Sequence, residues 1–253
     1  MEHIKTEDAE GLLIVHMSRG KANPINEVMV EELNAAVSQA ANDPGVRGVV
    51  LASDRPKFFS AGFDVTEVFS YDRDTMTTFF GRFIDLYEGM IKLPKPVIAA
   101  VNGHAFAGGA VLALACDSRV MSEGDFGFAL NEVNIGLVLP PGMIRMASGA
   151  VGVAKARDLV LEGKTLTPAE ALETGLASEL AAPEAVLERA IARARVLSEK
   201  PPLTFGRVKR YFVEVAGLLS PRGDREFLDR FIEHWFSPES TRHRQALIDS
   251  LRR

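Results

Sequence analysis

Residues 96–117 read Pro-Val-Ile-Ala-Ala-Val-Asn-Gly-His-Ala-Phe-Ala-Gly-Gly-Ala-Val-Leu-Ala-Leu-Ala-Cys-Asp, and this stretch is the strongest local signal in the chain. Pro96–Val101 is a short apolar run typical of a buried strand, and Ala110–Cys116 is typical of a buried helix. The glycine-rich turn between them ends in Gly108-Gly109. The first N–H groups of a helix have no partner within the helix, and they favour an anionic oxygen. Because glycine also allows a ligand to approach the backbone closely, the stretch predicts a strand, a turn and a helix whose start can bind an anion.

A second segment of small residues lies upstream, where Phe58–Asp64 reads Phe-Phe-Ser-Ala-Gly-Phe-Asp. If one backbone N–H from each segment points at the same oxygen, the two form an oxyanion hole. A thioester carbonyl that becomes an enolate is a suitable ligand for such a pair. Without further context, both segments are equally compatible with simple tight turns.

Outside these two segments, the spacing of apolar residues changes along the chain. The first half alternates between expected strands and helices, namely Leu12–Met17, Glu27–Ala41, Gly48–Ala52 and Thr75–Lys92. An apolar segment follows at Val133–Leu139, and beyond Gly149 the expected elements are helices. These include a capping box with proline at the first helical position, Thr167-Pro168-Ala169-Glu170, and amphipathic helices at Ala185–Ser198 and Pro238–Leu251. This order predicts an α/β core with a C-terminal helical extension.

Composition excludes several classes of protein. The 253 residues are 47% hydrophobic and 25% charged, which is ordinary globular usage, and the formal net charge of −5 provides no basic surface for nucleic acid. Cys116 is the only cysteine, so a disulfide within the chain is excluded and a reducing compartment is expected. Met1–Glu10 lacks the order of a signal peptide, and no apolar run approaches the ~20 residues of a membrane span. We therefore expect a cytoplasmic protein.

The familiar phosphate, dinucleotide, metal and serine-nucleophile motifs are missing from the sequence. Neither a P-loop nor the Gly-x-Gly-x-x-Gly fingerprint is present. Neither His-Glu-x-x-His nor paired cysteines occur, so no metal site is expected, and the Gly-x-Ser-x-Gly elbow is also missing.

Both glycine segments resemble the signatures of the crotonase family, the enoyl-CoA hydratase/isomerase superfamily. Phe59–Asp64 is similar to the first signature, and Pro96–Gly109 followed by Leu114–Asp117 is similar to the second. The resemblance implies a crotonase-like spiral of ββα turns over residues 1–195 and a C-terminal helical region over residues 196–253 that helps to form trimers. It also implies a homotrimer or a hexamer made of two trimers, an acyl-CoA substrate of fatty-acid β-oxidation, and no separate cofactor, since coenzyme A is part of the substrate.

The resemblance also assigns roles to individual residues. The N–H groups of Phe63 and Gly108 match the family's two oxyanion donors. The candidate contacts to coenzyme A in the first signature are Ser60, Ala61, Gly62 and Asp64. Asp64 is equally typical of a turn residue. Several basic residues, Arg145, Arg157, Lys209 and Arg210, are candidates for the phosphates of coenzyme A.

Two positions bear on the reaction. Family members that resemble true hydratases carry two glutamates, and here the first position is Val111 while the second matches Glu132. Hydration uses two carboxylates to hold and deprotonate water, whereas moving a double bond needs one shuttling base. Asn131-Glu132 with the following Ile135–Val138 also resembles the Δ3-Δ2-enoyl-CoA isomerases. We therefore expect an isomerase with Glu132 as the single acid/base, with its pKa raised by burial, and with Asn131 either orienting the thioester or the base or making a local turn.

Alternatives to the isomerase remain at this stage. One is a hydratase with a single glutamate and a water held by backbone groups. Decarboxylation and thioester hydrolysis use the same oxyanion hole, and a non-catalytic acyl-CoA or RNA-binding scaffold is a third class. We expect structural roles for His104 in the glycine turn and for Trp235 near the C-terminus.

Overall fold

The computed structural model of the chain describes residues 1–220 and 223–251. Its larger sheet has six strands in the order β1-β2-β3-β5-β7-β9. They are β1 (Ile4–Asp8), β2 (Leu12–Met17), β3 (Gly48–Ser53), β5 (Val97–Val101), β7 (Ser118–Ser122) and β9 (Glu179–Ala181). Only β1 and β2 pair in an antiparallel manner, and the other neighbours are parallel. The central strands β3, β5 and β7 are nearly continuous buried runs, as expected for a parallel sheet covered on both faces.

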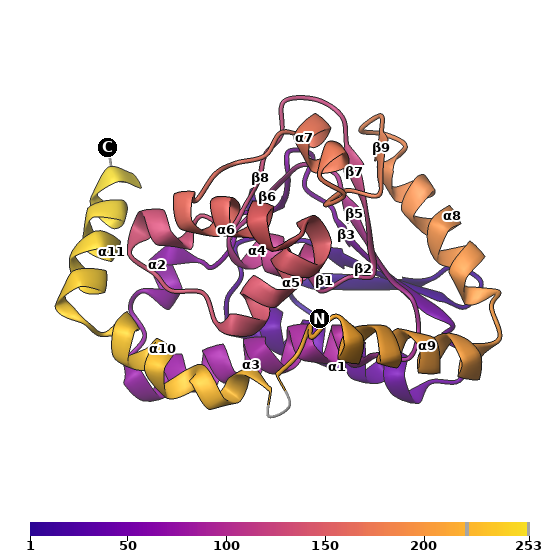
Figure 1. Cartoon of the computed structure of the whole chain (residues 1–253), viewed down its shortest axis with the longest axis horizontal. Coiled ribbons are helices and arrows are strands. Elements are labelled where there is room, and N and C mark those ends of the chain that lie inside the picture. Colours follow the sequence, from indigo (N-terminus) through magenta and orange to yellow (C-terminus); the bar gives the residue numbers. More distant parts are fainter. Residues whose placement is uncertain (221–222, 252–253) are drawn as a thin grey trace.

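A smaller parallel sheet lies beside the first and contains β4 (Phe58–Ser60), β6 (His104–Phe106) and β8 (Phe128–Ala129). The chain visits the two sheets in turn: β3 is followed by β4, β5 by β6 and β7 by β8. Each pair of strands is followed by helical structure before the next pair begins. The architecture is therefore the spiral of ββα turns that the family resemblance implies, with helices at its C-terminal end (Figure 1).

Helices cover both faces of the larger sheet. In chain order they are α1 (Glu27–Asn42), α2 (Val65–Val68), α3 (Arg73–Lys92), α4 (Gly108–Leu114), η1 (Glu132–Ile135), α5 (Pro141–Val151), α6 (Val153–Glu162), α7 (Pro168–Glu173), α8 (Val186–Ser198), α9 (Pro202–Val215), η2 (Asp224–Phe227), α10 (Leu228–Trp235) and α11 (Pro238–Leu251). Side chains alternate along a strand, so Leu13 and Val15 belong to the core under α1 and α3, whereas Leu12 and Ile14 pack with α8 on the opposite face.

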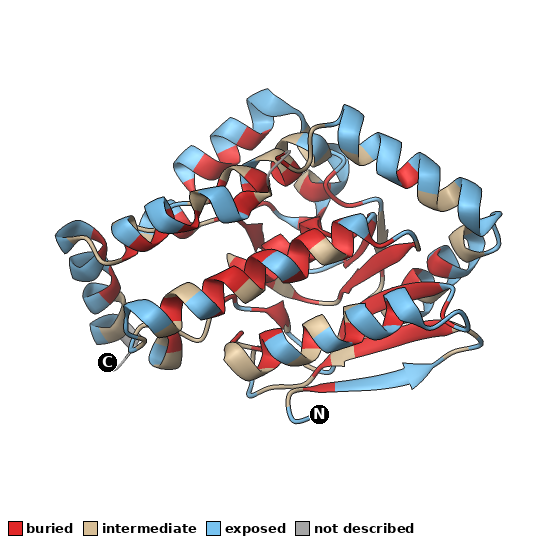
Figure 2. Ribbon diagram, turned by 90° about the horizontal axis from the view of Figure 1, so that it is seen from below, coloured by how far each residue is buried: buried red, intermediate tan, exposed pale blue. Residues whose placement is uncertain are grey.

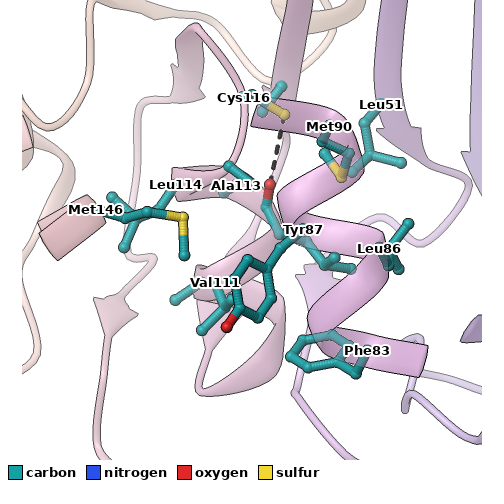
Figure 3. Close-up of a cluster of buried hydrophobic side chains, with 14 of the residues drawn as sticks. Leu51, Phe83, Leu86, Tyr87, Met90, Val111, Ala113, Leu114, Cys116 and Met146 are labelled. Carbon is teal, nitrogen blue, oxygen red and sulfur yellow. Dashed lines mark hydrogen bonds between the residues drawn. The ribbon is translucent and has the colours of Figure 1, made fainter. Parts of the chain in front are cut away.

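The helices α3 and α4 both contribute buried side chains to the main core. One side of α3 is buried along most of its length, whereas the edge strand β1 is largely exposed (Figure 2). Figure 3 shows part of this core, where Tyr87 and Met90 of α3 lie in one cluster with Val111 and Leu114 of α4. The thiol of Cys116 is in the same cluster, and burial raises the pKa of this thiol to about 12, which makes it an inert core residue.

The C-terminal helices return to the core rather than forming a separate body. The expected division between residues 195 and 196 falls inside α8, because this helix packs on the sheet and continues to Ser198. Further along, α10 lies along α3, and α11 reaches η1 (Figure 1). Trp235 is fully buried and packs against Phe231 and Phe69, which is the packing role predicted for it.

The part of the chain that the structure describes contains no helix long and apolar enough to cross a bilayer.

Candidate active site

The backbone around Phe63 is fixed on both sides by one residue, Ile25. The N–H of Ile25 donates to the carbonyl of Gly62, and the N–H of Asp64 donates to the carbonyl of Ile25, both at 2.8 Å. Gly62 has a φ of +90°, a region that glycine adopts readily. Within the described residues the N–H of Phe63 between these two bonds donates to no other group. It is therefore available to a ligand.

A second available N–H belongs to Gly108, the first residue of α4. It also has no acceptor among the residues that the structure covers. The preceding Ala107 has a φ of 46° and a ψ of −122°, a conformation that costs a non-glycine residue about 1–3 kcal/mol. A hydrogen bond of 2.9 Å from the N–H of Ala107 to the carbonyl of Ala129 helps to hold this turn in place. Strain of this kind is often found where backbone is held for a function.

The two segments lie against each other. A Cβ atom added to Gly62 would lie 3.3 Å from the nitrogen of Gly108, and one added to Gly108 would lie 3.1 Å from the ring of Phe63. One added to Gly109 would lie 2.5 Å from the carbonyl oxygen of Ser60, so only glycine fits there. Phe63 and Gly108 line one cavity of about 170 Å³. Two unpaired N–H groups beside a shared cavity are the arrangement that an oxyanion hole requires.

Glu132 lines the same cavity. It is the first residue of η1, which follows the strand β8, and its side chain is only 8% exposed. Its Oε2 atom is buried and has no hydrogen-bond partner in the described part of the protein. Burial raises the pKa of this carboxyl from 4.5 to about 7, because the charged form loses its hydration. A carboxyl group with such a pKa can both take and return a proton near neutral pH.

The other walls of the cavity are almost entirely apolar. Val111 of α4 is fully buried on one wall. The further apolar lining comes from several elements: Val65, Phe69, Phe80, Phe83, Ile135, Leu137, Val138, Leu139, Pro140, Met143, Phe231 and Leu247. Asn131 is the remaining polar lining residue, and its side chain makes no hydrogen bond to the described residues. The cavity thus combines one carboxyl group, one amide group and a hydrocarbon surface.

The candidate residues of the first signature occupy different positions. Ala61 is exposed and lines the cavity, whereas Ser60 is fully buried and its hydroxyl donates to the carbonyl of Asn23 at 2.8 Å. Asp64 caps α2 by accepting from the N–H groups of Thr66 and Glu67, and its carboxylate pairs with Arg19 at 2.6 Å. These contacts hold the pKa of Asp64 below its usual value although burial opposes them. Neither Ser60 nor Asp64 reaches the cavity wall.

Two candidates for the phosphates of coenzyme A, Lys209 and Arg145, and the histidine of the glycine turn make their contacts outside this cavity. Lys209 is buried and its ammonium group pairs with Asp117 at 2.8 Å. Arg145 lies 3.7 Å from the carboxylate of Asp224. His104 accepts a hydrogen bond at Nδ1 from the N–H of Gly127 at 3.0 Å and contacts three phenylalanine rings, which is a structural role. Among residues 1–220 and 223–251 no group of three or more His, Cys, Asp or Glu side chains is arranged to hold a metal ion.

Phe231 and Leu247 line the cavity but were not among the sequence candidates. They come from α10 and α11, more than a hundred residues after the two signatures. Both are ordinary apolar positions of amphipathic helices, so the sequence contains no motif that marks them.

The model of the family described as enoyl-CoA hydratase/isomerase matches residues 7–243. A "Probable enoyl-CoA hydratase" of Rhizobium meliloti (strain 1021) is 34% identical over 195 residues, which are 77% of this chain and 74% of the relative. A protein of Mycobacterium tuberculosis, described as an enoyl-CoA isomerase in one solved structure and as a probable enoyl-CoA hydratase in another, superposes in the first of these with a TM-score of 0.82 and 26% identity, over 91% of this chain and 99% of that one. The human mitochondrial Δ3-Δ2-enoyl-CoA isomerase superposes with a TM-score of 0.92 over 99% and 98%, and its 24% identity bears on the fold alone.

Proposed function

The chain belongs to the enoyl-CoA hydratase/isomerase family, and from this premise we propose that it is a Δ3-Δ2-enoyl-CoA isomerase with Glu132 as its single acid/base. The thioester oxygen binds between the N–H groups of Phe63 and Gly108. Glu132 takes a proton from C2 of a 3-enoyl-CoA, and the electrons move onto the thioester oxygen to give a dienolate. Glu132 then returns the proton at C4, which gives the 2-enoyl-CoA. No separate cofactor is needed, because the reaction is an internal transfer of one proton.

The observation that carries this proposal is that Glu132 is the only carboxylate lining the cavity in the described part of the chain. Its free Oε2 atom and its pKa of about 7 suit a base that must also act as an acid. Where a hydratase-like member has its other glutamate, the buried side chain of Val111 offers no acceptor to a water molecule. The apolar walls also favour a reaction that excludes water.

The second candidate is an enoyl-CoA hydratase, and it is favoured by the name of the Rhizobium meliloti relative. In that reaction Glu132 would deprotonate a water molecule that backbone groups hold. This water would need acceptors that the apolar lining around Val111 lacks. The two reactions differ in substrate, so they can be separated directly.

The test is to supply purified protein with 3-hexenoyl-CoA and, separately, with crotonyl-CoA. An isomerase forms the conjugated 2-enoyl thioester from the first and leaves the second unhydrated. Glu132→Gln should fold but lose isomerisation by about 10² or more, the scale of general-base loss. Glu173→Gln, an exposed glutamate of α7, is the matched control and should retain activity. Robust formation of 3-hydroxybutyryl-CoA, or full isomerisation by Glu132→Gln, would overturn the proposal.

We also propose that the chain assembles into trimers, alone or paired as hexamers. Support comes from α9, which exposes the apolar side chains of Leu203, Phe212 and Val215 while its only buried residue is Lys209. Exposed apolar surface of this kind marks an interaction site.

A further inference from the structure

Two stacked phenylalanine rings form part of the buried wall of the cavity. Phe80 of α3 and Phe231 of α10 both line it, and their ring centroids are 3.5 Å apart with planes inclined by 5°. Both residues are buried, at 2% and 5% exposure, whereas Ala61 is exposed and Val138 is 39% exposed. The cavity therefore opens beside Ala61 and Val138, and the stacked pair belongs to its buried wall.

Other buried rings hold this stack in place. The ring of Phe80 lies edge-on to Phe63, with centroids 6.1 Å apart and planes at 89°. On the other side, Phe231 lies 5.8 Å from Trp235, which is fully buried. Rings packed on both sides cannot turn away without opening voids, which a packed core resists. The Phe80–Phe231 stack is thus a fixed wall rather than a movable one.

We infer that this stack sets the upper limit on the length of the acyl chain. The inference rests on the proposed function, because it takes the acyl chain of a CoA thioester as the occupant with its carbonyl at Phe63 and Gly108. The cavity of about 170 Å³ is lined mainly by hydrocarbon. A dry protein cavity of ~150 Å³ holds a benzene molecule, so this one holds about six carbons. The preferred substrates are therefore short acyl-CoA thioesters of about six carbons. Acyl chains of ten or twelve carbons do not fit, because the Phe80–Phe231 stack blocks them.

Phe231 is the residue of the pair to change, because it lies on a C-terminal helix whereas Phe80 is part of the central helix α3. Removing its ring in Phe231→Ala enlarges the cavity at the place where the ring now lines it. Phe227→Ala is the matched control, since Phe227 lies one helical turn earlier, contacts the guanidinium of Arg230 at 5.6 Å and does not line the cavity.

Binding of saturated acyl-CoA thioesters tests the inference without depending on the reaction. Titration calorimetry with hexanoyl-, octanoyl-, decanoyl- and dodecanoyl-CoA should give a wild-type Kd for dodecanoyl-CoA at least about tenfold weaker than for hexanoyl-CoA. Phe231→Ala should reduce or reverse this ratio by about tenfold, and Phe227→Ala should keep the wild-type ratio. Equal wild-type affinity across the series, or equal ratios in the two variants, would overturn the inference.

Two further measurements keep the test decisive. If circular dichroism shows that Phe231→Ala is unfolded, Phe231→Leu replaces it, where a smaller shift toward longer chains supports the inference and no shift overturns it. Isomerisation of 3-hexenoyl- and 3-dodecenoyl-CoA is measured in parallel. If the protein selects chain length in binding but isomerises neither substrate, the proposed reaction is refuted while the stack is supported as the limit on chain length. If it isomerises both substrates with equal kcat/KM, the reaction stands and the role of the stack as a limit on chain length is refuted.

Discussion

The carboxylate of Asp224 accepts a hydrogen bond from the N–H of Gly142 at 3.0 Å, across 82 residues of sequence. Gly142 is near the start of α5, whose own N-cap residue, Pro140, has no side chain that can cap the helix. Asp224 thus caps the start of α5 from a distant part of the chain, a role that a polar residue at the N-cap position usually fills. Its other oxygen accepts from the hydroxyl of Tyr87 at 2.5 Å. Because Met143 of α5 lines the cavity, this contact joins the C-terminal region to a wall of the site.

Replacing Gly142 by alanine should destabilise the protein. The added Cβ would lie 2.0 Å from Oδ2 of Asp224, so the carboxylate must move away from both of its donors. We expect the free energy of unfolding to fall by about 1–3 kcal/mol, the usual cost of overpacking. Denaturant titration measures this. In the control Gly89→Ala the new methyl group meets only a methyl of Val37 at 3.4 Å, and helix propensity favours alanine by up to ~1 kcal/mol. Equal stabilities for the two variants would refute the argument.

The rate of isomerisation should depend on pH through Glu132. Only the carboxylate form can take a proton from C2, and burial places its pKa at about 7. We therefore expect kcat/KM to rise with pH through a midpoint near 7 and then to level off. A profile that is flat between pH 5 and pH 9, or one centred near 4.5, would show that this carboxyl group is not the base.

The same group should make the folded protein less stable as pH rises. The unfolded chain loses this proton near pH 4.5, whereas the folded protein keeps it to about pH 7. Relative to the unfolded state, the stabilising effect is full below pH 4.5 and is lost progressively up to about pH 7. Glu132→Gln removes the ionisation, so the unfolding free energy of the variant should exceed that of the wild type at pH 8 by on the order of 1–3 kcal/mol, and the difference should shrink at pH 5. A variant that is less stable at pH 8 would contradict a buried, unpartnered carboxylate.

The exposed face of α9 should hold the subunits together. Phe212 and Val215 are 62% and 89% exposed in the single chain. We expect light scattering to give three or six times the 27.5 kDa mass of the chain. The double variant Phe212→Asp/Val215→Asp should dissociate into monomers, because charged groups are costly to bury in an apolar interface. Ala35→Asp, on the exposed side of α1, is the control and should not dissociate. A monomeric wild type would remove the basis for the trimer.

Local sequence patterns were enough to predict the centre of the fold. The strand expected at Pro96–Val101 is β5, and the capping box at Thr167 is present with both of its hydrogen bonds. The helix expected at Ala110–Cys116 instead begins at Gly108 and ends at Leu114. This start agrees with the anion-binding interpretation of the stretch, in which Gly108-Gly109 open the helix; glycine is a poor helix former, yet the first residues of a helix tolerate it when close packing against Ser60 requires it.

Elements without a periodic pattern of apolar residues were not predicted. The edge strand β1 has a single buried residue, Ile4, so its sequence shows no alternation. The apolar face of α9 is exposed within one chain, so the spacing of its apolar residues does not indicate which side of the helix packs on the core. The cavity residues Phe231 and Leu247 were missed because only the three-dimensional return of α10 and α11 brings them to the site. The expected burial of Glu132 is present, but the sequence did not indicate that its carboxyl group would lack a partner, and the apolar segment that follows it, Val133–Leu139, is only half-buried or exposed.

Position 111 offers the sharpest distinction between isomerase and hydratase. Val111 is fully buried and shares the cavity with Glu132. Val111→Glu would supply a second carboxyl group, which can hold a water molecule and deliver its proton. We expect hydration of crotonyl-CoA to rise at least about tenfold above the wild-type level, which is less than the usual ~10²–10⁴-fold contribution of a general acid or base because the new group is not otherwise positioned, and isomerisation to fall as water enters.

Burying a new carboxyl group also raises its pKa and lowers stability, so folding of Val111→Glu must be checked by thermal melting at the assay temperature. Val111→Gln is the matched control, because it has a similar size and can bind water but cannot transfer a proton as a base. Hydration by Val111→Glu above that of Val111→Gln would assign the difference to the carboxyl group itself. If the folded Val111→Glu protein hydrates no faster than Val111→Gln, or if the wild type already hydrates as fast as either, the absence of a second carboxylate at this position does not decide the reaction.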